Sequence, residues 1–350
     1  HISYYDQTNA DLKYCRKNAG VWTAETVDSA IPPRGWFTSI ALDAAGNPRI
    51  SYQDQTSGDL KYAAKNGGIW TRESVDVAGN VGWYTALALD AAGNPRISYF
   101  DFTNQDLKFA ARNGATWSIE TVDAADCKGS YTSLALKGGN PVIAYFDCTN
   151  SNLRLAEKVG ASWQIAEVDT AGDVGEHTSL RIASDGQPRV SYARHPNAAG
   201  FDGGIRYAWR SSGGQWAFTS IDTAAHYTYF TSLRLDSHDV PTIAYQDFHG
   251  NDVPPGDSIL KLAQVQFASA VPELPAPAAG LLRVTPNPIV ATARIALTLE
   301  RPVARLQVQV FDVSGRVVNT LHDGAAPVGP FEVIWDGRTA EGGTAVSGLY

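Results

Sequence analysis

The sequence predicts an all-β protein, a β-propeller built from repeated four-stranded units followed by a small β-sandwich. A motif of the type Ile-Ser-Tyr occurs six times, beginning at residues 2, 50, 97, 143, 190 and 243. A tryptophan recurs in step at residues 22, 70, 117, 163 and 216, about 47 residues apart. Propeller blades have this length, and roughly 4 to 8 of them close a ring. We therefore predict six blades over residues 1–267, with seven as the alternative.

Turn signals divide each repeat into four strand-like runs. In the clearest copy these runs are 84–89, 96–100, 107–111 and 117–122, and glycine, asparagine and proline stand between them. Those residue types are the ones that tight turns require. The partial repeats at the two ends form either separate blades or one shared blade. Because the chain opens inside a second run, we expect that upstream residues were removed.

Composition and charge exclude several classes of protein. The net charge of -8 argues against a nucleic-acid partner, which would need a basic face. The sequence contains no apolar run of about 18 residues, so it predicts no membrane-spanning segment. The three cysteines match no zinc or redox spacing. Cys127 and Cys148 fall in neighbouring connections on one face, where we expect a disulfide in an exported protein, and Cys15 is expected to be a small buried residue.

The turns that precede the tryptophans indicate a family resemblance. Residues 65–70 (Lys-Asn-Gly-Gly-Ile-Trp) and 112–117 (Arg-Asn-Gly-Ala-Thr-Trp) resemble the Asp-box hairpin of sialidase-type propellers. The defining aspartate is replaced by asparagine or another residue. The resemblance supports the propeller fold and implies no sialidase activity.

A different β pattern follows the repeats. Residues 268–280 contain prolines at 272, 275 and 277 and predict an extended linker. Residues 281–350 then carry Pro-Asn-Pro at 286, Asp-x-x-Gly-Arg at 312, Trp-Asp-Gly-Arg at 335 and Ser-Gly-x-Tyr at 347. In this order the elements resemble the immunoglobulin-like (Ig-like) domain of flagellar hook-capping proteins and the C-terminal sorting domains of type IX secretion cargo.

That resemblance implies a bacterial protein that is exported to the extracellular space or attached at the cell surface. It also implies contact with the bacterial secretion machinery through the C-terminal domain. The family pattern continues with a final strand beyond Tyr350. We therefore expect the domain to be C-terminally truncated.

One face of the predicted propeller varies more than the other. The loops between blades and those between second and third strands share this face, which we call the loop face. The second-to-third loops are short at 54–57 and 101–104 but lengthen at 194–204 and 247–256. Insertions confined to one face often mark a binding face. We predict recognition of a glycan or a surface protein there.

The candidate ligand-binding residues combine rings that stack on sugars with carboxylates that bind hydroxyls. They are Trp36, Trp83, Tyr229, Asp54, Asp101 and Asp247. The next column along the inner strands is expected only to pack, and comprises Phe37, Tyr84, Tyr131 and Phe230. The aspartates also have a structural interpretation, because an Asp followed by Thr and Asn caps its own turn.

Two kinds of metal site are candidates on this face. Calcium suits its several carboxylates, although a calcium loop supplies more oxygen ligands in sequence. A transition metal would need clustered histidines. The candidates for that site are His195, His226 and His249.

The sequence favours a binding protein over an enzyme. Catalytic residues break the symmetry of a repeat, whereas Arg49, Arg96 and Arg189 preserve it, and no Ser-His-Asp or Cys-His signature is present. We therefore expect no catalytic residue. The alternatives are a glycoside hydrolase or sialidase-like enzyme, and a structural or adhesive surface module without a small-molecule site.

Overall fold

The computed structural model describes residues 1–29, 34–124, 126–195, 203–223, 227–248, 258–264, 283–285, 292–299, 302–311, 317–340 and 342–343. The chain divides into two compact units, His1–Gln266 and Phe267–Tyr350. Among the described residues, no helix has the length and apolar character that crossing a membrane requires.

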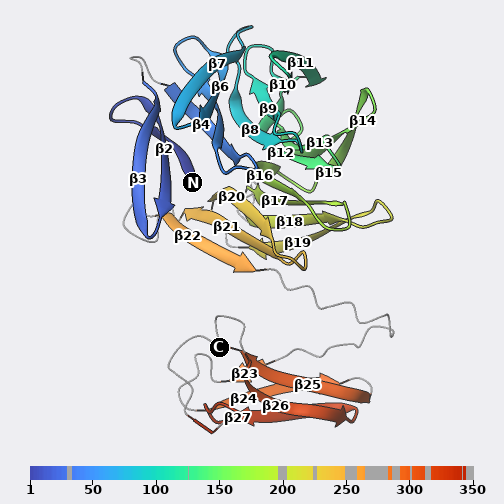
Figure 1. The fold of residues 1–350 in the computed structure, drawn as a ribbon. Helices are drawn as coiled ribbons and strands as arrows, with labels where there is room; N and C mark the ends of the chain where they lie inside the picture. The colour runs from blue at the N-terminus through green and yellow to red at the C-terminus, as the bar shows by residue number, and fades with distance from the viewer. Residues whose placement is uncertain are drawn as a thin grey trace. The chain divides into compact units, whose positions relative to one another are not determined.

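The first unit is a six-bladed β-propeller, which confirms the predicted fold. Its described strands form six antiparallel sheets placed side by side around a ring (Figure 1). The first blade contains β1 (Ile2–Asp6), β2 (Asp11–Asn18) and β3 (Val21–Asp28), and the second contains β4 (Arg34–Leu42), β5 (Pro48–Asp54), β6 (Asp59–Asn66) and β7 (Ile69–Asp76). The third contains β8 (Trp83–Leu89), β9 (Pro95–Asp101), β10 (Asp106–Asn113) and β11 (Thr116–Asp123). The fourth contains β12 (Lys128–Lys137), β13 (Asn140–Asp147), β14 (Asn152–Val159) and β15 (Ser162–Asp169). The fifth contains β16 (Val174–Ile182), β17 (Pro188–Arg194), β18 (Gly204–Arg210) and β19 (Trp216–Asp222), and the sixth contains β20 (Tyr227–Leu235), β21 (Pro241–Phe248) and β22 (Ser258–Gln264).

The two partial repeats form separate blades. Strands β1, β2 and β3 correspond to the second, third and fourth strands of a complete blade, whereas β20, β21 and β22 correspond to the first three. The innermost strands β4, β8, β12, β16 and β20 contact one another in that order around the axis. Each apolar core lies between neighbouring blades, as when Leu60 and Tyr62 of the second blade pack with Ile97 and Tyr99 of the third.

A repeated hydrogen bond joins each blade to the one before it. The Tyr99 hydroxyl donates to the Asp76 carboxylate, and Lys108 reaches both Asp76 at 2.7 Å and Asp101 at 3.3 Å. Burial alone would raise the pKa of Asp76, but hydrogen bonds from Lys108 and Tyr99 outweigh burial and lower it. A buried carboxylate stays favourable only when it is paired in this way. The bond recurs as Tyr52–Asp28 (2.6 Å), Tyr99–Asp76 (2.7 Å), Tyr145–Asp123 (2.7 Å), Tyr192–Asp169 (2.5 Å) and Tyr245–Asp222 (2.8 Å).

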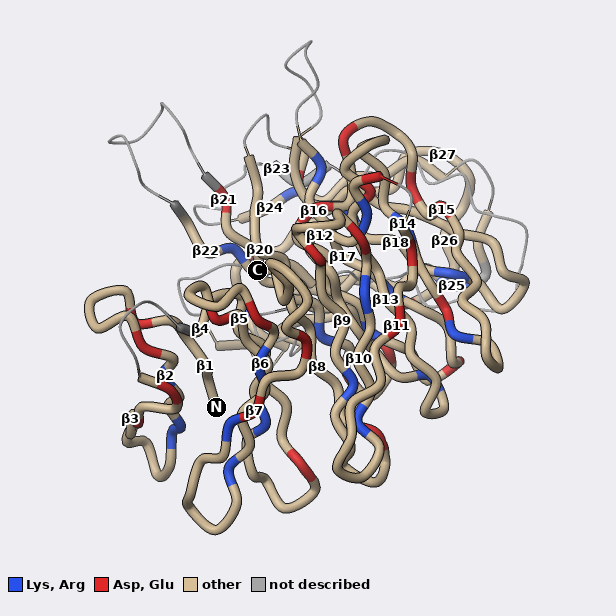
Figure 2. Tube along the Cα trace, turned by 90° about the horizontal axis from the view of Figure 1, so that it is seen from above, with Lys and Arg blue, Asp and Glu red and all other residues tan. Residues whose placement is uncertain are grey.

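The recurring tryptophans provide a second contact between blades. Trp163 packs edge-on against Phe109 of the preceding blade with ring centroids 5.4 Å apart. Its Nε1 donates to the Glu120 carboxylate at 3.0 Å, and Lys158 binds the same carboxylate. Acidic and basic residues are interspersed over the propeller strands (Figure 2). The repeated Tyr, Asp and Trp therefore have structural roles.

The second unit contains two described sheets. Strands β23 (Arg283–Thr285), β24 (Ala293–Leu299) and β27 (Gly329–Trp335) form one sheet, and β25 (Val303–Phe311) pairs with β26 (Val317–Ala326) in the other. Ala293, Val310, Val318 and Trp335 pack together as their core. The predicted linker and the motifs at 286, 312 and 347 lie outside the described residues. The motif at 335 forms a turn, because Trp335 Nε1 donates to the Arg338 carbonyl at 2.8 Å.

Candidate functional site

An irregularity recurs near the start of the innermost strands. The register of β8 against β9 shifts between Trp83 and Ala86, and Tyr84 within this bulge has a φ of 52°. A bulky residue in the left-handed region is a true outlier and costs about 1–3 kcal/mol. The same conformation occurs at Phe37 (φ 49°), Tyr84 (52°), Tyr131 (53°), His177 (52°) and Phe230 (52°). Its recurrence in five blades points to a shared role for these rings.

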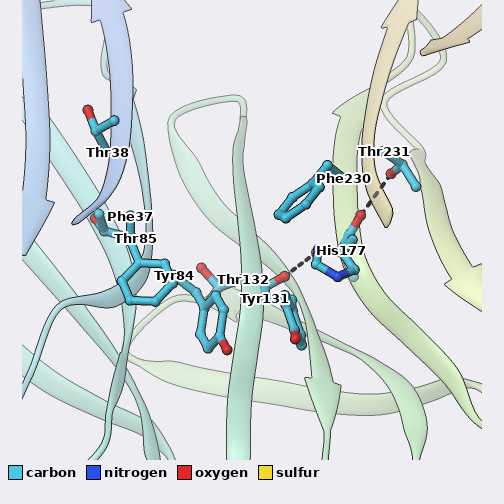
Figure 3. A pocket seen from close by; sticks show the side chains of 10 residues that line it. Phe37, Thr38, Tyr84, Thr85, Tyr131, Thr132, His177, Phe230 and Thr231 are labelled. Carbon is cyan, nitrogen blue, oxygen red and sulfur yellow. Dashed lines mark hydrogen bonds between the residues drawn. The ribbon is translucent and has the colours of Figure 1, made fainter. Parts of the chain in front are cut away.

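These five rings, which we call the aromatic collar, surround the propeller axis. Consecutive centroids, from Phe37 through Tyr84, Tyr131 and His177 to Phe230, lie 4.6, 4.3, 4.2 and 4.5 Å apart. Figure 3 shows them side by side, each contributed by a different blade. Together with the threonine that follows each ring they line a cavity of about 350 Å³. The collar thus forms an open, aromatic pocket.

The threonines of the pocket are fixed by neighbouring blades. Thr85 Oγ1 donates to Ser51 Oγ at 2.8 Å, and Ser191 and Thr231 share a hydrogen bond of 2.8 Å. Thr231 Oγ1 also donates to the His177 carbonyl at 2.8 Å, and this hydrogen bond ties the threonine to a residue of the collar (Figure 3). The serine of the repeated Ile-Ser-Tyr motif therefore orders the pocket wall.

The pocket carries no formal charge at neutral pH. Burial lowers the pKa of His177 to about 4, with a smaller effect from His195, so its imidazole is neutral. Burial raises the pKa of Tyr84 and of Tyr131, so both hydroxyls stay protonated. The lining residues are otherwise phenylalanines and threonines. An uncharged ligand suits such a surface best.

The predicted stacking residues lie beside the pocket and not in its lining. Trp83 stacks on Phe102 with centroids 4.7 Å apart, and its Nε1 donates to Asn80 Oδ1 at 2.9 Å. Trp36 packs against Tyr5. Tyr229 lies with its ring centroid 5.4 Å from that of His177. The lining instead comes from the neighbouring column of Phe37, Tyr84, Tyr131 and Phe230, together with His177, and a role of Trp36, Trp83 and Tyr229 in ligand binding stays a prediction.

The three predicted ligand aspartates are buried, with exposed fractions of 1% for Asp54 and 0% for Asp101 and Asp247. Asp101 accepts hydrogen bonds from the backbone of Thr103 at 3.0 Å and Asn104 at 3.1 Å, as its structural interpretation predicted. Each of the three also pairs with a lysine: Asp54 with Lys61 (2.9 Å), Asp101 with Lys108 (3.3 Å) and Asp247 with Lys261 (2.6 Å). Burial and pairing support the structural interpretation of these aspartates, and ligand binding by them stays a prediction.

The predicted histidine group is only partly described, because His226 and His249 lie outside the described residues. His195 lies next to two carboxylates, with its Nε2 3.5 Å from Glu176 Oε2 and its Nδ1 3.8 Å from Asp173 Oδ2. We call Asp173, Glu176 and His195 the rim triad. Burial raises the pKa of Glu176, His195 opposes the rise, and Asp173 adds to it. The Tyr131 hydroxyl of the collar acts on Glu176 in the opposite direction to burial and lowers its pKa.

The rim triad occupies a position that recurs in two other blades. The backbone N–H of Phe102 donates to the Asn80 carbonyl at 2.9 Å, that of Cys148 to Cys127 at 3.1 Å, and that of His195 to Asp173 at 2.9 Å. The structure joins Cys127 and Cys148 in a disulfide, with Cα atoms 5.4 Å apart. The three equivalent sets are Asn80, Trp83 and Phe102; Cys127, Ser130 and Cys148; and Asp173, Glu176 and His195. Asp173 and Glu176 were not among the residues predicted from the sequence. They could have been found because they differ from the residues at the equivalent positions of the third and fourth blades.

Comparison with known proteins identifies the C-terminal unit. Residues 287–350 match the family model of the FlgD Ig-like domain. This match agrees with the resemblance that the motifs indicate. No curated protein sequence matches the chain significantly.

Solved structures similar to the chain include proteins of several kinds. One is a protein of unknown function from Dyadobacter fermentans (13% identity, TM-score 0.49, covering 72% of this chain and 84% of that one). A second is an alpha-L-arabinofuranosidase from Lactobacillus brevis (11%, TM-score 0.40, 65% and 90%). A third is a fucose lectin from Kordia zhangzhouensis (16%, TM-score 0.29, 37% and 96%). With TM-scores below 0.5, these similarities carry no information about the activity of this chain.

Proposed function

We propose that this chain is a non-enzymatic carbohydrate-binding protein of the bacterial surface or extracellular space, and that it binds its ligand in the aromatic collar. The observation that supports this most strongly is the pocket, whose volume is about 350 Å³ and whose walls are five rings and five threonines. Ligand pockets typically have volumes of about 300–1,000 Å³ and combine apolar walls with a few fixed polar groups. Sugars present apolar faces and hydroxyls together, which matches this lining.

The charge of the pocket narrows the ligand class. Because His177 is neutral and the other lining residues are Phe, Tyr and Thr, a carboxylated or sulfated sugar would gain no ion pair within the lining. Desolvating its charge would remain a cost. We therefore favour a neutral glycan over an acidic one.

The C-terminal unit supports the proposed location. Its FlgD Ig-like match covers residues 287–350 and agrees with a role in export or attachment through the bacterial secretion machinery. In this proposal the propeller recognises the glycan, while the C-terminal unit provides delivery to the surface.

A glycan-array screen of the full chain tests the proposal, followed by calorimetric titration of any glycan that binds. The variant Tyr84→Gly removes one ring, and glycine suits the φ of 52° at this position. We expect it to weaken binding about tenfold or more, the equivalent of about 1.4 kcal/mol. Phe102→Ala is the matched control, because Phe102 lies outside the pocket lining and 48% of its surface is exposed. Equal loss in both variants, or no glycan bound at all, would contradict the proposal.

A second candidate function is glycoside hydrolysis, and one observation favours it. Glu176 has a raised pKa, contacts Tyr131 of the collar, and stands beside a second carboxylate, Asp173. Glycosidases use two carboxyl groups in contrasting environments. Assays on a panel of aryl glycosides, with Glu176→Gln as the inactive variant, separate the two functions. Turnover by the wild type that is abolished in Glu176→Gln would replace the binding proposal with this one.

A further inference from the structure

Three neighbouring blades use the same position at the rim of the loop face in three ways. In the third blade the position is closed by Trp83, which stacks on Phe102 and donates to Asn80. In the fourth blade it is closed by the disulfide between Cys127 and Cys148. The fifth blade instead brings together three side chains that can each ligate a metal.

From this juxtaposition we infer that Asp173, Glu176 and His195 form a binding site for a divalent transition-metal cation of the zinc class. Their ligating atoms all lie within 4.8 Å of one another. All three side chains are partly buried, and those of Glu176 and His195 have exposed fractions of 19% and 15%. Asp173 lies in the connection into the fifth blade, Glu176 lies in its innermost strand β16, and His195 directly follows β17, so the blade itself holds the three together.

Two atoms of the rim triad are buried without a hydrogen-bond partner among the described residues. They are Asp173 Oδ1 and His195 Nε2. Buried polar atoms are nearly always satisfied, and an exception calls for an explanation such as an ion. At the equivalent position of the third blade, Asn80 Oδ1 accepts hydrogen bonds from both Trp83 and Gln53. The contrast indicates that the fifth blade holds its donor atoms for a ligand.

The donor set selects the class of cation. One imidazole nitrogen with two carboxylates suits zinc and similar transition metals. Calcium requires about six to eight oxygen ligands, more than Asp173 and Glu176 supply. Three protein ligands also leave coordination positions for water or another ligand.

The site would connect the rim of the loop face to the collar. Glu176 precedes His177 in the chain and interacts with the Tyr131 hydroxyl, and both His177 and Tyr131 line the axial pocket. A cation held by Glu176 would therefore fix this side of the collar. Cation binding at the rim does not depend on glycan binding, because the rim triad already has its donor atoms close together when the pocket holds no ligand.

Calorimetric titration of the metal-stripped full chain with Zn²⁺ tests the inference, with Ca²⁺ titrated in parallel. We expect one Zn²⁺ per chain, and a rise in the melting temperature that a chelator reverses. The variants His195→Phe and Glu176→Gln should each weaken Zn²⁺ binding at least about 100-fold. Loss of a residue that only hydrogen-bonds a metal ligand weakens binding by up to about that factor, and loss of a ligand should weaken it at least as much. His195→Phe introduces the residue that the third blade has at the equivalent position, so we expect the variant to fold.

The control variant is His238→Ala, which removes an exposed histidine of the turn between β20 and β21 and should leave Zn²⁺ binding unchanged. No binding of Zn²⁺ by the wild type would overturn the inference. So would Zn²⁺ binding that persists in both His195→Phe and Glu176→Gln. Saturable binding of Ca²⁺ in place of Zn²⁺ would overturn the assignment of the cation.

Discussion

The third and fifth blades share one backbone arrangement at the rim but differ completely in what fills it. Phe102 N–H donates to the Asn80 carbonyl at 2.9 Å, and His195 N–H donates to the Asp173 carbonyl at the same distance. The third blade fills this arrangement with a tryptophan stacked on a phenylalanine, whereas the fifth places three ionisable groups there. The residues that recur in every repeat thus determine the structure of the blade. Positions that vary between repeats can hold different side chains, including ionisable ones.

Buried, hydrogen-bonded carboxylates recur around the propeller, and their protonation in acid is the largest effect we expect. Burial would raise the pKa of Asp76 and of Asp147, but their hydrogen bonds outweigh it and lower both. Because the folded pKa lies below the unfolded value of about 3.9, the unfolded chain takes up protons first as the pH falls. Stability should therefore begin to decrease below about pH 6.5, because the unfolded chain takes up a proton on His177 whose folded pKa is about 4, and should decrease more steeply below about pH 4, where the carboxylates are protonated. Thermal unfolding monitored by circular dichroism across this range checks it, and an unchanged melting temperature at pH 3 would contradict it.

The glycine that precedes the rim position should matter equally in both blades. A Cβ on Gly82 would lie 3.0 Å from Leu60 Cα, and one on Gly175 would lie 2.8 Å from Leu153 Cα, both at positive φ. We expect Gly82→Ala and Gly175→Ala each to lower the free energy of unfolding by about 3 kcal/mol or more, through crowding and backbone strain together.

Gly93→Ala is the control for these substitutions. Gly93 has a φ of 81° but no neighbouring atom within 4 Å of an added Cβ, so only the strain of about 1–2 kcal/mol remains. Denaturant unfolding of the three variants measures the difference. A smaller loss at Gly175 than at Gly93 would show that the backbone of the fifth blade is not held as described.

The hydrogen bond between blades should contribute a smaller and again similar amount. Tyr99→Phe in the third blade and Tyr192→Phe in the fifth each remove a hydroxyl that donates to a buried carboxylate. We expect each to cost about 1.5–3 kcal/mol in the free energy of unfolding. Tyr4→Phe changes the same repeat position where the side chain is 37% exposed, and should change stability by less than about 0.5 kcal/mol. An equal cost at all three positions would contradict this role.

The smallest effect on stability is expected at the rim itself. His195→Phe replaces a ring whose buried Nε2 has no hydrogen-bond partner within the described part of the chain with the apolar residue of the third blade. We expect the free energy of unfolding without metal to change by less than about 1 kcal/mol. A loss of several kcal/mol in denaturant unfolding would mean that His195 serves to hold the blade together.

Much of the fold could be predicted from the sequence because the repeat is itself a structural requirement. Tyr, Asp and Trp recur because they join successive blades, and the turns recur because each blade needs them. Cys127 and Cys148 were identified from their chemistry and their place in neighbouring connections. The same two positions in the next repeat hold Asp173 and His195, so aligning the repeats on the cysteines would have indicated the triad.

The lining of the pocket could not be predicted in the same way. Side chains alternate between the two faces of a strand, and a register that slips by one residue exchanges them. The bulge at Tyr84, with its positive φ, turns this residue to the axis in place of Trp83. Aromatic residues rarely adopt this conformation, so nothing in local propensity indicates it. The positive φ of these residues is explained by the packing of five rings around the axis, which is a contact between blades and not a local preference.

The most direct test of the proposed function is calorimetric titration of the full chain with the best glycan from the array, comparing the wild type with Tyr84→Gly and Phe102→Ala. We expect one binding site, about tenfold or more weaker in Tyr84→Gly and unchanged in Phe102→Ala. Binding that survives in Tyr84→Gly but is lost in Phe102→Ala would place the ligand at the rim and contradict the assignment of the collar as the binding site.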